Sequence, residues 1–171
     1  MAYQSDTVKI MSELSLLGWG ALLLGWHRGW INREDVSHYA VEWLSARPHG
    51  NDGMVALLAA GELLADDELT DLMHRLADNE EADHCSPPNQ AESDSRAINS
   101  WRLARLIELV SRPGCRDERW QDAVEEVYAE FNYPEDMRSC SRYQSGVAGQ
   151  STEDAIRHLI RKLRAQLLID D

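Results

Sequence analysis

Residues 14–44 have the sequence LSLLGWGALLLGWHRGWINREDVSHYAVEWL. Hydrophobic side chains recur here three and four positions apart, which is the spacing of a helix that buries one side. The spacing predicts a first helix over residues 8–29. One stripe along that helix contains Trp19, Leu22, Leu23 and Trp26 and continues to Trp30.

A second helix is expected to begin after Asn32. Asparagine is a favoured N-cap residue, and Asp35 stands three positions later, where a carboxylate can complete a capping box. The glycines of the first helix argue for close packing, since each would destabilise an isolated helix by up to about 1 kcal/mol relative to alanine. They are Gly18, Gly20, Gly25 and Gly29.

The rest of the chain keeps the same helical spacing, with no sustained alternation of apolar and polar residues. Turn residues separate the segments: Pro48–Gly53, a polar loop over Ser86–Ser95, Pro113-Gly114, and an irregular stretch from Pro134 to Gln150 with one helical turn. Ser151 and Asp154 predict the cap of the last helix. The further helices are expected at residues 54–65, 66–84, 96–111, 116–131 and 151–169.

Length and spacing together predict an all-α fold. A chain of 171 residues suits one domain, so we expect a single helical domain over residues 1–171, a bundle of six or seven helices. The run 54–65 is apolar on most sides and is expected to be central. The six tryptophans are expected to pack in the core.

The net charge limits the classes of partner. Thirty acidic against 17 basic side chains leave −13, which would repel a nucleic-acid backbone or an anionic membrane surface. The longest apolar run, Leu14–Trp26, falls short of the roughly twenty residues that cross a bilayer. With no secretory signal pattern, and three cysteines without C-x-x-C spacing, the sequence predicts a cytoplasmic protein with reduced thiols.

Most of the charge lies in residues 62–95. This segment contains eleven acidic residues against Arg75 alone, which gives −10 of the total −13. On a helix of 100° per residue, Asp67, Asp71, His74 and Asp78 fall on one side. The opposite side contains Leu69, Leu72, Met73 and Leu76.

The carboxylate row has two interpretations. It is a solvated face, partly neutralised by basic residues of the last helix, or it is a docking face for a basic partner. Those basic residues are Arg157, Arg161, Lys162 and Arg164. The candidate partner-binding residues are Asp66, Asp67, Glu68, Asp71, His74, Asp78, Glu80, Glu81 and Asp83, with Tyr133 and Tyr143 as candidate apolar anchors.

Motifs for catalysis and metal binding are sparse. Glu81-x-x-His84 has the spacing of a di-iron ligand pair, but such sites need a second copy and further glutamates. Gly146–Gly149 precedes a helix without the lysine and strand of a phosphate-binding loop. We therefore expect no catalytic residues, no cofactor and no metal. A helical enzyme that uses carboxylates and a metal stays open as an alternative.

Residues 14–44 carry a resemblance to known proteins. The features that carry the resemblance are Trp19-Gly20, Gly25-Trp26, the basic break His27-Arg28 and the acidic pair Glu34-Asp35. With these, the stretch resembles the opening of a family of small uncharacterised bacterial proteins.

Small acidic helical proteins of this kind also resemble immunity proteins, which are encoded beside a secreted toxin and protect the producer by binding it. The resemblance implies binding to a basic toxin, such as a type VI nuclease effector, without catalysis. A non-catalytic adaptor is a further alternative.

Overall fold

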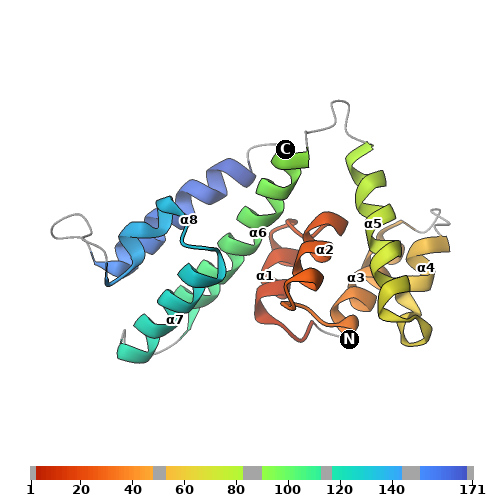
Figure 1. Cartoon of the computed structure of the whole chain (residues 1–171), viewed down its shortest axis with the longest axis horizontal. Helices are drawn as coiled ribbons and strands as arrows, with labels where there is room; N and C mark the ends of the chain where they lie inside the picture. Colours follow the sequence, from red (N-terminus) through yellow and green to blue (C-terminus); the bar gives the residue numbers. More distant parts are fainter. Residues whose placement is uncertain (1–2, 48–52, 83–89, 113–116, 144–150, 169–171) are drawn as a thin grey trace. The chain divides into compact units, whose positions relative to one another are not determined.

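The structure is a computed structural model that describes residues 3–47, 53–82, 90–112, 117–143 and 151–168. These residues form eight α-helices and two short 3-10 helices, and they contain no strand (Figure 1). The predicted all-α class is confirmed. No helix built from them is long and apolar enough to cross a membrane.

The chain divides into two compact units, Met1–Ala97 and Ile98–Asp171. The first unit contains two pairs of packed helices: α2 packs on α5, and α3 packs on α4 and on the 3-10 helix η1. Its fully buried side chains include Leu22, Val36, Leu58, Leu69 and Met73. Its elements are α1 (Asp6–Glu13), α2 (Trp19–His27), α3 (Arg33–Ala46), α4 (Gly53–Ala59), η1 (Gly61–Leu63) and α5 (Asp66–Ala82).

The second unit contains the later part of α6 (Gln90–Ser111), α7 (Glu118–Glu130), η2 (Glu135–Cys140) and α8 (Thr152–Leu167). Here α8 packs on η2. The guanidinium of Arg102 on α6 donates to both carboxylate oxygens of Asp136 at 2.9 and 2.8 Å. The core includes Trp101, Leu103, Leu106, Met137, Ile156 and Leu163. The single domain over residues 1–171 stays a prediction.

The prediction of one helix over residues 8–29 is wrong. The chain leaves α1 at Ser15, which has a left-handed φ of 55°, and α2 begins after Gly18. The amide of Leu16 donates to the carbonyl of Met11 at 2.9 Å, and that of Ser15 to Ser12 at 3.0 Å, which is a Schellman closure. This break raises the number of α-helices above the expected six or seven.

Three other helix starts can be compared with the sequence predictions. The polar stretch expected to be a loop up to Ser95 is helical from Gln90 onward, so α6 is longer than predicted. The predicted cap of α3 is confirmed, because Asn32 and Asp35 form a complete capping box. Ser151 likewise accepts from the amide of Asp154 at 3.1 Å.

Candidate functional site

Helix α5 is two-sided, as its sequence predicts. Its first turn contains three acids, which the positive end of the helix dipole stabilises. Leu69, Met73 and Leu76 are buried on the inner side. We define the outer face of α5 as Asp67, Asp71, His74 and Asp78, and all four side chains are exposed.

Two predicted site residues stabilise the start of α5. Asp66 forms an ion pair with Arg33 of α3, whose guanidinium also donates to the carbonyls of Gly61 and, at 2.7 Å, Leu64. The Glu68 carboxylate accepts a hydrogen bond from the amide of Ala65 at 2.9 Å. This bond, from the residue before the helix to its third residue, is one half of a capping box. These two carboxylates have structural partners within the unit.

Glu80 has a different role from the one that its place in the acidic segment suggested. It is half-buried, and its Oε2 accepts from the amide of Trp19 at 2.8 Å and, more weakly, of Gly20 at 3.4 Å. Helix α2 has Gly18 at its N-cap and no side-chain cap of its own. A Cβ on Gly18 would lie 2.9 Å from Oε1 of Glu80, so the missing side chain makes room for the carboxylate. Glu80 therefore caps α2 from across the packed pair.

The outer face keeps its charge largely uncompensated. Asp71 pairs with Arg75 at 2.9 Å, and both side chains are well exposed, which makes the pair worth at most about 1 kcal/mol. Asp67 and Asp78 have no ion pair or hydrogen bond with any residue that the structure describes. Asp83 and the side chain of Glu81 lie outside the described part, as does His84.

The outer face adjoins α2 along a polar seam. The rings of His74 and His27 are 5.5 Å apart, and the indole of Trp26 donates to Thr70 at 2.9 Å. Two histidines do not complete a metal site, and no group of three or more potential ligands occurs among the described residues. His74 of the outer face thus lies beside His27 of α2.

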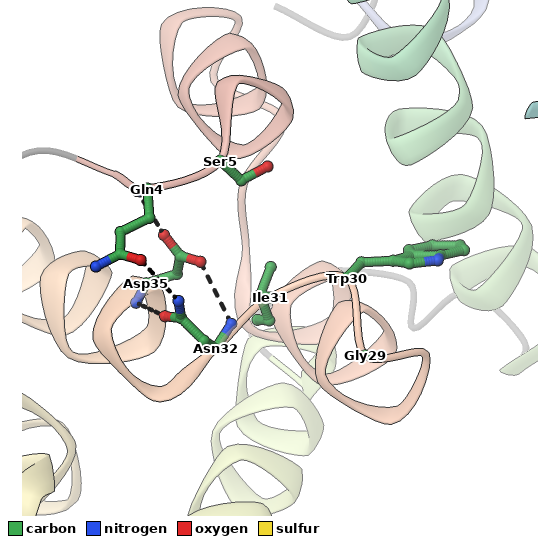
Figure 2. A pocket seen from close by; sticks show the side chains of 7 residues that line it. All are labelled: Gln4, Ser5, Gly29, Trp30, Ile31, Asn32 and Asp35. Atoms are coloured by element: carbon green, nitrogen blue, oxygen red, sulfur yellow. Dashed lines mark hydrogen bonds between the residues drawn. The ribbon is translucent and has the colours of Figure 1, made fainter. Parts of the chain in front are cut away.

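A shallow hollow of about 290 Å³ lies where the N-terminal segment crosses the start of α3. Figure 2 shows the buried carboxylate of Asp35 between two backbone amides, those of Gln4 at 3.1 Å and Asn32 at 3.3 Å. Its polar groups are occupied by the capping box and by the N-terminal segment. The polar groups of Asp35 and Asn32 in this hollow therefore serve the cap of α3.

Burial raises the pKa of the Tyr39 hydroxyl and of the Cys140 thiol, two groups outside the acidic face. Burial is the main cause of the raised pKa of Tyr39, and the Glu80 carboxylate raises it further; the Tyr39 hydroxyl donates to the carbonyl of Leu17 at 3.1 Å. Burial also raises the pKa of the Cys140 thiol to about 11. Both groups are neutral at physiological pH, which fits structural roles.

The candidate anchors Tyr133 and Tyr143 are both exposed, and both belong to the second unit. Tyr133 packs edge-on against Tyr128 with ring centroids 5.1 Å apart, and Tyr143 lies under the guanidinium of Arg142 at 4.8 Å. Two other apolar side chains, Leu57 and Leu63, are also exposed and lie in the same unit as α5. Their exposure could not be predicted from the spacing of apolar residues.

Fold and site together define an all-α protein with one strongly acidic amphipathic helix. A family model described as "Uncharacterized protein conserved in bacteria (DUF2247)" matches residues 9–168, and the chain belongs to this family. No curated protein and no solved structure matches the chain. The resemblance of residues 14–44 to a bacterial family is thereby confirmed, while the immunity role stays a prediction.

Proposed function

We propose that this protein is a cytoplasmic immunity protein that binds a basic toxin through the outer face of α5. The observation that carries the proposal is the state of Asp67 and Asp78, two exposed carboxylates without a counter-ion in the described part of the chain. Asp67 and Asp71 stand four residues apart, and like charges at this spacing on a helix are unfavourable by roughly 0.2–0.5 kcal/mol per pair. A basic partner would relieve that repulsion.

The proposed inhibition needs no chemistry by this protein. A nuclease has to be electropositive where it holds phosphates, so a row of carboxylates can occupy the same surface as a substrate mimic. Long-range attraction between opposite charges also speeds association. The contribution of the outer face should therefore appear mainly in the association rate and should fall with added salt.

The test is protection in vivo by co-expression with the secreted effector encoded next to this gene. We expect the wild-type chain to restore colony formation. Asp67→Lys, Asp71→Lys and Asp78→Lys together should abolish protection, because they turn the outer face from acidic to basic.

A matched control has the same change in charge at other exposed acids, each without a partner among the described residues: Glu13→Lys, Glu118→Lys and Glu126→Lys. This variant should still protect. Protection by a folded outer-face triple variant would remove α5 from the mechanism, and the absence of a neighbouring effector gene would favour the adaptor hypothesis.

A further inference from the structure

Four apolar residues of α4, η1 and the turn between these two elements are exposed. They are Ala56, Leu57, Ala60 and Leu63. Leu57 is 52% exposed and Leu63 is 90% exposed. We call these four residues the α4 apolar face.

This exposure corrects the expectation that residues 54–65 are central. Val55 and Leu58 are completely buried on the inner side, where α4 packs on α3. Helix α4 has seven residues, and its contacts with α3 and α5 leave Ala56 and Leu57 exposed. The hydrophobic residues on the other side are in contact with water. Packing of α4 does not require hydrophobic residues at these positions, since polar residues would serve there as well.

Negative charge adjoins the α4 apolar face. Four residues of chain span at most about 14 Å, so Asp67 lies within that distance of Leu63. Arg33 fixes the connection, because it binds the carbonyls of Gly61 and Leu64 together with the Asp66 carboxylate. Helices α4 and α5 are also in contact (Figure 1). The α4 apolar face and the start of the outer face of α5 therefore lie near each other within the first unit.

We propose that these two surfaces together dock an amphipathic helix of the basic partner. The apolar side of that helix would cover Leu57 and Leu63, and its lysine or arginine residues would face Asp67 and Asp71. Exposed apolar patches beside polar residues mark protein-binding sites, and a few buried anchors supply most of the binding energy in such interfaces. The inference rests on the proposed function and assigns the apolar anchors that the acidic face lacks.

The test uses two labelled synthetic peptides of 18 residues containing only leucine and lysine. In one peptide the leucines share a helical face; the other has the same composition in an order that forms no such face. Affinity for the full-length protein is measured by fluorescence anisotropy. Leu57→Ser with Leu63→Ser should weaken binding of the amphipathic peptide at least tenfold and that of the other peptide less than threefold.

The matched control is Val41→Ser with Leu168→Ser, two hydrophobic residues that are exposed elsewhere. This pair should change affinity less than twofold. Leu57→Ala with Leu63→Ala preserves helix propensity and should still give at least a threefold loss. An affinity within twofold of wild type for both leucine pairs would overturn the inference.

The acidic triple Asp67→Asn, Asp71→Asn and Asp78→Asn separates the two proposals. If the acidic triple binds the peptide more weakly and the leucine pairs bind it as well as wild type does, this inference is overturned and the proposal for the acidic face is supported. If the leucine pairs bind the peptide more weakly and the acidic triple binds it as well as wild type does, the proposed role of the acidic face and the basic nature of the partner are overturned.

Hydroxyl-radical footprinting distinguishes other occupants. We expect oxidation of Leu57 and Leu63 in the free protein and protection by the amphipathic peptide. No oxidation in the free monomer would show that the chain itself covers the face. Self-association that the leucine pairs abolish would identify a second copy. Either result would overturn the inference.

Discussion

At the scale of single residues, the carboxylates of α5 have different functions. Glu80 accepts hydrogen bonds from the first amides of α2, whereas Asp78, two residues earlier, is exposed without a partner in the described structure. A carboxylate at a helix N-terminus gains from both the free amides and the helix dipole. Position relative to α2, rather than residue type, therefore decides which acids stabilise the fold.

Glu80→Ala should destabilise the protein by about 1–2 kcal/mol, because the amides at the start of α2 lose their acceptor. Urea denaturation followed by tryptophan fluorescence measures the change. The control Asp78→Ala should stay within about 0.5 kcal/mol of wild type. Equal effects of the two substitutions would contradict the capping role of Glu80.

Cys140 predicts a loss of stability at alkaline pH. Its pKa is raised from 9.0 to about 11 in the folded protein, so between these values the unfolded chain loses the thiol proton while the folded chain keeps it. The free energy of unfolding should fall as the pH rises through this interval. Cys140→Ala should reduce the pH dependence there, and an unchanged slope would contradict the assignment.

At the scale of helices, three elements end in the same way. The residues after the C-caps of α1, α2 and α7 are Ser15, Gly29 and Asn132, all with positive φ. In α2 the amide of Trp30 donates to Gly25 at 2.8 Å, and in α7 the amide of Tyr133 donates to Tyr128 at 2.9 Å. Glycine and asparagine tolerate this conformation well, whereas serine is strained there.

Opposite substitutions at two of these positions should shift stability in opposite directions. Ser15→Gly should stabilise the protein by up to about 1 kcal/mol, because it relieves the left-handed backbone. Gly29→Ala should destabilise it by about 1–2 kcal/mol for the converse reason. A Cβ on Gly29 would meet no other atom within 4 Å, so the expected loss comes from the backbone conformation alone. Thermal denaturation by circular dichroism measures both, and shifts of the same sign would contradict this account.

Local signals explain which helices could be predicted. Two N-caps each lie within four consecutive residues of the sequence, and the structure contains both: Asn32 with Asp35, and Ser151 with Asp154. The break at Ser15 has no glycine to mark it, and the apolar spacing continues on both sides. The start of α6 was hidden for another reason: its polar composition resembles a loop.

At the scale of the whole molecule, sequence predicted the charge of the site better than its contacts. The two-sided pattern of α5 placed Asp67, Asp71, His74 and Asp78 together, because helical spacing alone determines which residues share a side. The partner of Glu80 lies some 60 residues away in sequence. The only local hint is that α2 starts at a glycine without a capping side chain. The exposure of Leu57 depends on what α4 packs against, which composition does not reveal.

The net charge predicts a response to salt. Repulsion among the excess carboxylates should be screened as NaCl rises to 0.5 M, so the free energy of unfolding should increase by up to about 1 kcal/mol. The variant with Asp67→Asn, Asp71→Asn and Asp78→Asn should gain less. A fall in stability with salt would show that the ion pairs outweigh the repulsion.

The separation along α5 between residues that support the fold and residues that face outward has an evolutionary consequence. The contacts that support the fold occupy its inner side and its two ends, through Asp66, Glu68 and Glu80. Related chains can therefore exchange the intervening outward residues while the packed side of the helix stays intact. Under the proposed function, a lineage could follow a changing toxin by altering three or four codons of a single helix.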